Sequence, residues 1–204
     1  MNENLLMIFT RNPELGKVKT RLAKSLGDES ALTIYKMLLD KTKEVTQNLS
    51  CDKAVFYSVK VRDNDIWDNK IYHKYSQEGK DLGERMHNAF KEAFKKGYKK
   101  VAIIGSDLFD LKASCIDVAF QQLGTNDVVV GPANDGGYYL LACKNEVPEI
   151  FKDKNWGSDT VLTDTLSDLK NHKVFQLEVL NDIDYAEDLE PYEIFKPFIK
   201  LKNL

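Results

Sequence analysis

The sequence predicts a three-layer α/β/α fold with a mostly parallel central sheet. Short apolar runs typical of buried strands alternate along the chain with longer amphipathic stretches typical of helices. Glycines also stand where several of these helices should end. The 204 residues are 43% hydrophobic and contain no repeat or linker that would divide the chain. We therefore expect a single domain over residues 1–204 with a sizeable core.

The first elements show the alternation most clearly. Residues 5–10 are a continuous apolar run, as expected for a strand buried on both faces. A polar loop and a short helix ending near Gly27 follow, and Asp28 is a plausible N-cap of a long helix to about residue 49. The next expected elements are strands over residues 53–59 and 71–76 and a helix over residues 82–96, which Gly97 closes.

The second half continues the pattern to the end of the chain. We expect strands over residues 101–104, 127–131, 138–143 and 174–179, and helices over residues 113–123, 158–169 and from Ala186 onward. In open α/β sheets, ligands bind beyond the carboxyl ends of the strands. The functional residues are therefore expected in the loops that follow the strands.

Charge and cysteine content narrow the class of protein. The net charge is −3, so the chain lacks the excess of positive charge that is typical of proteins that bind a nucleic acid polymer. No apolar stretch approaches the ~20 residues that a membrane-spanning helix needs. The three cysteines are widely spaced and form no metal-binding or disulfide pattern. We expect a cytoplasmic protein that uses neither a membrane nor a nucleic acid.

The loop after the first expected strand is rich in basic residues. Gly16 permits a tight turn there, and the following helix presents free backbone N–H groups. This composition suits a polyphosphate, although a solvated basic turn is the alternative, and Val18 after Lys17 excludes a Walker A motif. The four basic residues are Arg11, Lys17, Lys19 and Arg21.

Two aspartates follow later strands and are candidate metal ligands. Asp107 comes directly after the strand at residues 101–104, where a carboxylate can hold Mg²⁺ against substrate phosphates. Asp110 is either a helper of Asp107 or the N-cap of the next helix. Asp184 either caps the last helix or supplies a second ligand opposite Asp107.

A glycine-rich turn joins the strands at residues 127–131 and 138–143. A simple hairpin explains Asp135, Gly136 and Gly137 without any function. Paired glycines also let a backbone approach a ligand closely, with Asp135 accepting hydroxyl protons. Both interpretations stay open from the sequence.

The order of these motifs resembles that of the DUF2064 family of glycosyltransferase-A-like bacterial proteins. The resemblance runs from about residue 5 to residue 189. It rests on KVKTRL (17–22), QEGKDLGERM (77–86), IGSD (104–107), GPANDGGYY (131–139), WGS (156–158) and DID (182–184). More remotely, the chain is similar to nucleotidyltransferases that load a sugar acid or a phosphorylated lactate onto a nucleotide. The resemblance implies the nucleotide-diphospho-sugar transferase fold.

The resemblance also implies roles for individual residues. Asp107 and Asp184 would hold Mg²⁺ or Mn²⁺, and Asp107, Lys19 and Asp135 would be catalytic. The nucleotide would contact Arg11, Lys17, Lys19 and Arg21 with its phosphates and Gln77, Asp81 and Gly83 with its base or ribose. The acceptor would contact Asp135, Gly136, Gly137, Trp156 and Ser158.

The chain departs from the family pattern in the loop that carries Asp107. Leu108 and Phe109 stand where the family usually has Cys-Pro or a similar pair. The Asp-x-Asp motif of many sugar transferases is also missing, because residue 105 is glycine. Because Asp107 itself is retained, the change at Leu108 and Phe109 concerns the conformation of the loop more than the metal ligand.

The expected activity is that of a metal-dependent transferase acting on a nucleotide or nucleotide-sugar and a small-molecule acceptor. In nucleotidyl transfer an acceptor phosphate or carboxylate attacks the α-phosphate, and in glycosyl transfer an acceptor attacks the anomeric carbon of the sugar. The basic first loop favours the former and the family resemblance the latter. A nucleotide-binding module without catalysis is the alternative from a different class.

Overall fold

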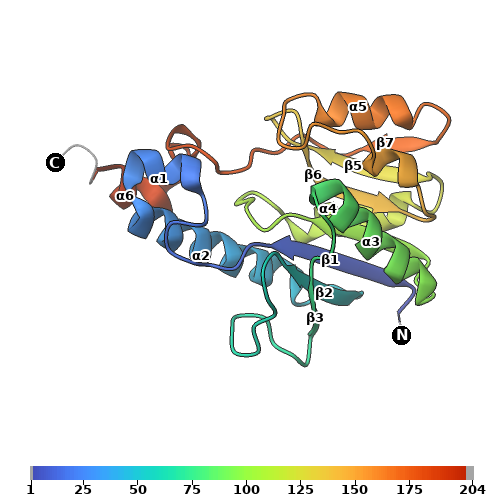
Figure 1. Cartoon of the computed structure of the whole chain (residues 1–204), viewed down its shortest axis with the longest axis horizontal. Helices are drawn as coiled ribbons and strands as arrows, with labels where there is room; N and C mark the ends of the chain where they lie inside the picture. Colours follow the sequence, from blue (N-terminus) through green and yellow to red (C-terminus); the bar gives the residue numbers. More distant parts are fainter. Residues whose placement is uncertain (1, 201–204) are drawn as a thin grey trace.

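The computed structural model describes residues 2–200 and has the three-layer α/β/α architecture that the sequence predicts (Figure 1). In this part of the chain a seven-stranded sheet has the order β3-β2-β1-β4-β6-β5-β7. The strands are β1 (Asn4–Thr10), β2 (Asp52–Tyr57), β3 (Tyr72–Ser76), β4 (Lys100–Ile104), β5 (Val128–Pro132), β6 (Tyr138–Cys143) and β7 (Val174–Gln176).

The sheet is mostly parallel, as predicted. β1 is the third strand in this order and pairs in parallel with β2 and β4. β2 pairs in parallel with β3, and β5 with β7. Only β6 among the described strands runs antiparallel, against both β4 and β5. The hairpin between β5 and β6 therefore brings the turn at residues 133–137 to the same edge of the sheet as the loop after β4.

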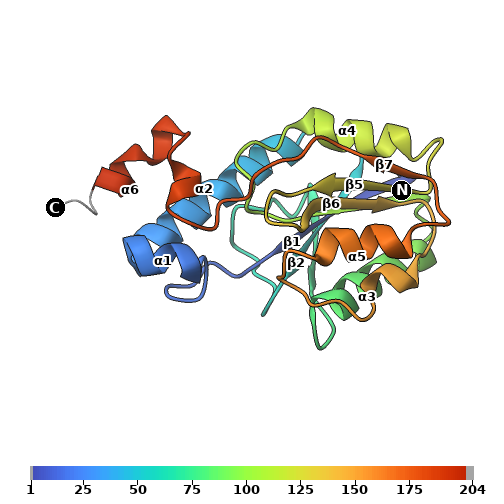
Figure 2. The same cartoon turned by 90° about the horizontal axis from the view of Figure 1, so that it is seen from above.

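Helices cover both faces of the sheet (Figure 2). α2 (Asp28–Thr46) and α4 (Ala113–Gln122) pack on one face. α3 (Leu82–Lys95) and the 3₁₀ turn η1 (Pro148–Phe151) pack on the other face, where α5 (Val161–Asp168) also lies. The short helix α1 (Thr20–Leu26) precedes α2. The helices α2, α3, α4 and α5 thus bury apolar residues against the sheet, which is the main source of their stability.

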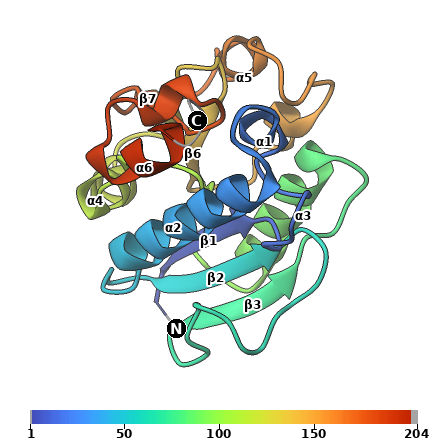
Figure 3. The same cartoon turned by 90° about the vertical axis from the view of Figure 1, so that its left-hand side faces the viewer.

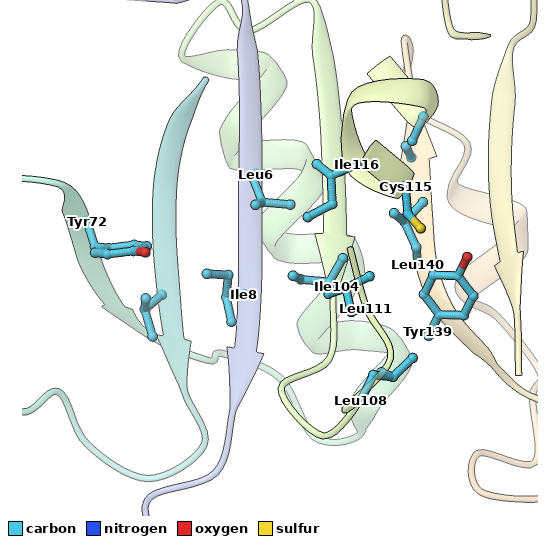
Figure 4. Close-up of a cluster of buried hydrophobic side chains, with 14 of the residues drawn as sticks. Leu6, Ile8, Tyr72, Ile104, Leu108, Leu111, Cys115, Ile116, Tyr139 and Leu140 are labelled. Atoms are coloured by element: carbon cyan, nitrogen blue, oxygen red, sulfur yellow. The ribbon is translucent and has the colours of Figure 1, made fainter. Parts of the chain in front are cut away.

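Strand β1 shows why the run at residues 5–10 is apolar throughout. Leu6 and Ile8 point into the core beneath α2 and α4, where they meet Ile104 and Ile116 (Figure 4). Leu5 and Met7 belong to the cluster on the opposite face. Because successive side chains of a strand alternate between faces, a strand covered on both sides needs apolar residues at every position.

A third apolar cluster ties the C-terminal segment to α1 and to the N-terminal part of α2 (Figure 3). Leu22 and Ile34 from the two helices pack with Ile183 and Phe195, and all four are fully buried. This cluster holds the chain around residue 184 against the first loop, although the two segments are far apart in sequence.

Two local predictions, the N-cap of the long helix and the length of the last strand, are wrong. Gly27, with φ 81°, is the N-cap of α2, and Asp28 is already its first residue. Gly27 itself ends α1 by donating to the Ala23 carbonyl, so the two helices join without room for a separate cap. The strand expected over residues 174–179 ends at Gln176, and Leu177 continues as irregular chain.

The helix predicted from Ala186 onward is also wrong. The segment forms the 3₁₀ turns η2 (Glu187–Leu189) and η3 (Glu193–Phe195), followed by α6 (Lys196–Lys200). Pro191 lacks a backbone N–H and fixes its own φ, so it interrupts an α-helix that would start at residue 186. The prediction for residues 201–204 lies outside the described residues.

The predicted end of the helix before Gly97 is confirmed. α3 ends at Lys95, and Gly97 follows with φ 95°, a left-handed conformation that suits glycine. Cys115 and Cys143 are buried free cysteines. Across residues 2–200, no helix combines the length and apolarity needed to cross a membrane.

Candidate functional site

The centre of the candidate site is a contact between loops that are distant in sequence. The Lys19 Nζ atom lies 3.0 Å from Asp107 Oδ2 and 2.8 Å from Asp184 Oδ1. Arg21 Nη1 lies 3.1 Å from Asp184 Oδ2. The Lys19 side chain is only 5% exposed. The structure therefore brings together four residues that the sequence marked as separate candidates.

Lys19 reaches this position through an unusual backbone conformation. It is the N-cap of α1 with φ 46° and ψ 47°, the left-handed region that residues with a Cβ rarely adopt. Such a conformation costs about 1–2 kcal/mol. The buried neighbour Val18 and the hydrogen bond from Ala23 N to the Lys19 carbonyl fix it. Strain of this kind is concentrated at functional sites.

The loop that carries Asp107 is held by its neighbours on both sides. A Cβ at Gly105 would lie 2.8 Å from Asp107 Oδ1, so a side chain there would displace the carboxylate. Leu108 is buried in the core beneath α2 and α4 (Figure 4). The Phe109 ring packs against Phe195, with their centroids 5.0 Å apart. Gly105, Leu108 and Phe109 thus anchor the loop, and the last two stand where the chain departs from the family pattern.

Tyr35 of α2 links the first loop to the Asp107 loop. Its hydroxyl lies 3.3 Å from Ser106 Oγ and 3.0 Å from Thr10 Oγ1, and it accepts a hydrogen bond from Arg11 N at 2.9 Å. Burial raises the pKa of Tyr35, so its hydroxyl keeps its proton. The two loops that carry the basic residues and Asp107 are therefore fixed relative to each other.

The segment from Asp182 to Asp184 lies along the Asp107 loop. Ile183 is fully buried and its N–H donates to the Asp107 carbonyl at 3.3 Å. Asp188 accepts hydrogen bonds from the backbone N–H of Asp184 at 2.9 Å and of Tyr185 at 2.7 Å. Because Ile183 points into the core, Asp182 and Asp184 both turn their carboxylates toward Asp107.

These three carboxylates form a compact cluster. One carboxylate oxygen from each of Asp107, Asp182 and Asp184 lies within 4.8 Å of the others. Burial, followed by the charges of Asp135, Asp107 and Asp184, raises the pKa of Asp182 to about 6. Burial alone would raise the pKa of Asp184 as well, but the charges and hydrogen bonds of Lys19 and Arg21 together outweigh it and hold that pKa below its usual value.

The Lys19 ammonium is a cation placed where the carboxylates converge. Burial acts to lower its pKa, yet the charges of Asp107 and Asp184 raise the pKa above that of a free lysine. Clustered carboxylate oxygens are the ligands that Mg²⁺ and Mn²⁺ prefer. The donor set therefore fits a divalent ion. Without the ion, the Lys19 ammonium neutralises part of the negative charge of Asp107 and Asp184.

A cavity of about 810 Å³ opens on one side of Lys19 and Asp107. It carries most of the basic side chains of the site and the ends of β1 and α3. The predicted site residues that line it are Arg11, Lys17, Lys19, Arg21, Gln77, Asp81, Asp107, Asp135 and Asp184. Its size and its basic walls suit a nucleotide with its phosphates.

A smaller cavity of about 230 Å³ adjoins the first. Its walls are mostly apolar and aromatic. Among the predicted acceptor residues, Asp135, Gly137, Trp156 and Ser158 line it. Asp107 and Asp135 line both cavities, so they stand at the boundary between them.

Two predicted site residues line neither cavity. A Cβ at Gly83 would lie 2.4 Å from the Phe151 carbonyl oxygen and 2.6 Å from Trp156 Nε1. A Cβ at Gly136, where φ is +85°, would lie 2.1 Å from the Asp159 carbonyl oxygen. Both glycines permit close packing of the segment at residues 151–159. They therefore affect the shape of the smaller cavity without lining it.

Two other predicted residues support the site with their side chains. Asp81 accepts a hydrogen bond from Glu84 N at 2.9 Å and caps α3. The Gln77 side-chain amide donates to the carbonyls of Thr10 and Phe56, which ties together the ends of β1 and β2. Each thus has a structural role at the rim of the larger cavity.

Sequence reasoning missed Asp182, Lys80 and Arg85. Asp182 belongs to the carboxylate cluster, and Lys80 and Arg85 line the larger cavity. The alternation of two aspartates around a buried isoleucine would have indicated Asp182, because residues two apart in extended chain share a face. Lys80 and Arg85 lie within the block at residues 77–86, of which only Gln77, Asp81 and Gly83 were singled out.

Comparisons with known proteins agree with the fold and give the family. The model of the DUF2064 family, described as uncharacterised proteins conserved in bacteria, matches residues 40–158. None of the curated protein sequences matches the chain. A solved structure from Desulfovibrio desulfuricans G20, assigned provisionally as a nucleotide-diphospho-sugar transferase, is 28% identical. The alignment covers 100% of this chain and 96% of that one, with a TM-score of 0.86.

More distant structures share the fold. A CMP:2-keto-3-deoxy-manno-octonic acid synthetase complexed with CTP has a TM-score of 0.55 at 9% identity, over 98% of this chain and 99% of that one. A manganese complex of a protein from Mycobacterium tuberculosis H37Rv has a TM-score of 0.54 at 11% identity, over 92% and 96% of the two chains. The fold is therefore that of nucleotide-diphospho-sugar transferases and cytidylyltransferases.

Proposed function

The chain belongs to the DUF2064 family of bacterial proteins, and we propose that it is a cytoplasmic, Mg²⁺- or Mn²⁺-dependent transferase of the glycosyltransferase-A or nucleotidyltransferase type. One domain over residues 1–204 binds a nucleotide or nucleotide-sugar and passes a glycosyl or nucleotidyl group to a small-molecule acceptor. Neither a membrane nor a nucleic acid polymer takes part.

The observation that carries this proposal is the position of the carboxylate cluster. Asp107, Asp182 and Asp184 converge beside Lys19, between a basic cavity and an apolar one. A transferase needs one site for the donor and another for the acceptor. The two sites must adjoin, because the donor and the acceptor react at one centre. The 28% identical structure assigned provisionally as a nucleotide-diphospho-sugar transferase supports the same class of activity.

In the donor cavity, Asp107 and Asp184 hold the divalent ion, and Asp182 is a third carboxylate within reach. The bound ion supplies positive charge that stabilises the phosphates as negative charge develops on them. Arg11, Lys17 and Arg21 bind those phosphates from the basic first loop, and Lys19 exchanges its carboxylate partners for a phosphate. The metal-bound and nucleotide-bound neighbours with this fold support a nucleotide and a divalent ion as ligands.

In the acceptor cavity, Asp135 lies where it can take a proton from the acceptor. Its Oδ1 atom accepts a hydrogen bond from Gly137 N at 2.8 Å, which orients the carboxylate at the boundary of the two cavities. Trp156 and Ser158 line the same cavity and contact the acceptor there. Gly83 and Gly136 act through the packing of that wall rather than by touching a ligand.

Isothermal titration calorimetry with and without Mg²⁺ tests the proposal. Nucleoside triphosphates, nucleoside diphosphates and nucleotide-sugars are titrated into the wild type and into Asp107→Asn. The proposal expects at least one nucleotide class to bind in a Mg²⁺-dependent manner, and Asp107→Asn to lose that dependence. The matched control is Asp117→Asn, an exposed aspartate on α4, which should bind as the wild type does.

Three outcomes would contradict the proposal. Absence of binding by every nucleotide would leave only the fold, and equal loss in Asp117→Asn would indicate a nonspecific charge effect. Binding that survives in Asp107→Asn, without turnover of any nucleotide-sugar or triphosphate, would favour a nucleotide-binding module without catalysis.

A further inference from the structure

The two cavities differ in the charges of their walls. The larger cavity is lined by six basic side chains, namely Arg11, Lys17, Lys19, Arg21, Lys80 and Arg85. Within residues 2–200, no lysine, arginine or histidine lines the smaller cavity, whereas Asp107, Asp135 and Asp182 do. With a divalent ion held by Asp107 and Asp184, the charge of Asp135 remains, and a phosphate or carboxylate in the smaller cavity would face it without a basic side chain of that cavity to bind it.

The rest of the smaller cavity is apolar. Phe9, Met86, Trp156 and Val161 form much of its wall. Tyr138 adds a hydroxyl whose hydrogen-bond partner is the Met86 sulfur at 4.0 Å, a weak acceptor. Burial raises the pKa of Tyr138, so this hydroxyl stays a neutral donor. Apolar walls with a few uncharged polar groups suit an uncharged ligand with a ring or chain.

We propose that the acceptor is an uncharged compound that offers a hydroxyl beside an apolar ring or chain, and that the reaction is glycosyl transfer to this hydroxyl. This inference rests on the proposed function, because it assigns the substrate class of the same site. It selects glycosyl transfer over attack by an acceptor phosphate or carboxylate. The six basic side chains of the larger cavity then bind the diphosphate of the donor.

The bond changes of this reaction balance. The acceptor oxygen attacks the anomeric carbon of a nucleoside-diphosphate sugar and forms a new C–O bond. The bond between that carbon and the β-phosphate oxygen breaks, and the nucleoside diphosphate leaves with the electron pair. The acceptor proton passes to the Asp135 carboxylate, which lines both cavities. A carboxylate in this place suits a hydroxyl acceptor and repels an anionic one.

The test has two stages. In the first stage, ADP, CDP, GDP, UDP and dTDP are titrated with Mn²⁺ to find the nucleotide that binds. In the second stage, the protein saturated with Mn²⁺ and that nucleotide is titrated with phenyl glucoside and with phenyl glucoside 6-phosphate. Trp156 fluorescence reports binding, since the other tryptophan, Trp67, is buried in the core at 2% exposure. Trp156→Phe should remove the signal.

The uncharged glucoside should bind at least about tenfold more tightly than its phosphate, because the phosphate adds charge beside the carboxylates. Asp135→Asn should reduce the ratio of the two dissociation constants, glucoside phosphate over glucoside, several-fold. Asparagine keeps an oxygen for the Gly137 N–H, so the turn is preserved and only the charge changes. A purely structural role of Asp135 would leave the ratio unchanged.

The outcomes separate this inference from the proposed function. Equal or tighter binding of the phosphate, no binding of either glucoside, or an unchanged ratio in Asp135→Asn overturns the inference while nucleotide binding stands. Failure of the first stage, with no Mn²⁺-dependent binding of any nucleotide, overturns both.

Discussion

Replacing Lys19 by methionine should destabilise the metal-free protein and increase its response to Mg²⁺. Methionine keeps the length of the stem and the strained backbone position, and removes only the ammonium. Asp107 and Asp184 then face each other without the cation that lies 3.0 Å and 2.8 Å from them. The substitution therefore isolates the charge at the centre of the site.

The expected loss follows from the exposure of the two carboxylates. Removing one partner of a fully buried ion pair costs about 3–5 kcal/mol, whereas an exposed pair contributes about 0–1 kcal/mol. The Asp107 and Asp184 side chains are 37% and 29% exposed, which places the pair between these limits. We expect the free energy of unfolding to fall by about 1–3 kcal/mol in the absence of divalent ions.

Urea denaturation with and without Mg²⁺ measures both effects. In the wild type an incoming Mg²⁺ must displace the ammonium, whereas in Lys19→Met it meets unpaired carboxylates. Mg²⁺ should therefore raise the free energy of unfolding more in the variant than in the wild type. Lys17→Met is the matched control, because Lys17 is 73% exposed and pairs only with Glu14 among the described residues. It should change the stability by less than about 0.5 kcal/mol.

A variant Lys19→Met as stable as the wild type without Mg²⁺ would refute the assigned role of the ammonium. An equal response of both proteins to Mg²⁺ would refute the idea that Lys19 occupies the place of the ion.

Three further substitutions test the packing around the two cavities. Gly136→Ala should cost about 2–4 kcal/mol in urea denaturation, because its Cβ would lie 2.1 Å from the Asp159 carbonyl oxygen at a positive φ; a near-neutral effect would contradict the packing described. Gly83→Ala should shift the Trp156 emission spectrum, since its Cβ would lie 2.6 Å from Trp156 Nε1, and an unchanged spectrum would show that the ring is not held there. Phe109→Ala should lower stability by about 2–4 kcal/mol and weaken Mg²⁺ binding in calorimetry, because the ring packs on the C-terminal segment that carries the second carboxylate. Lower stability with unchanged Mg²⁺ affinity would show that the packing of Phe109 does not position the metal ligands.

The sheet and its helices were predictable because their signals are local. A continuous apolar run such as residues 5–10 indicates a strand buried on both faces, and a glycine such as Gly97 marks a helix end. The error at Ala186 had a local cause too. The acidic residues near Ala186 favour a helix start when they are considered alone. Pro191 interrupts such a helix, and the prediction did not take it into account.

The arrangement of the site depended on contacts that no local pattern contains. The sequence marked Lys19, Asp107 and Asp184 singly, but their meeting requires the burial of Ile183 and Phe195 against α1 and α2. Sequence reasoning placed Lys19 on a substrate phosphate, whereas its ammonium lies between two carboxylates. A left-handed conformation at a lysine has no composition signal, so this pairing could not be foreseen.

The roles of the glycines near the site could not be predicted from the sequence either. A glycine motif beside a candidate site predicts either a close approach to a ligand or close packing of the chain. Gly136 and Gly83 serve packing, against Asp159 and Trp156 respectively. Only the positions of the opposing atoms distinguish the two cases.

Anomalous X-ray scattering from crystals grown with Mn²⁺ and a nucleoside diphosphate tests the central claim most directly. The account predicts a manganese peak at about 2.0–2.6 Å from oxygens of Asp107 and Asp184, with the Lys19 ammonium moved onto a phosphate. A Lys19 ammonium still bridging the two carboxylates, with manganese elsewhere or absent, would contradict it.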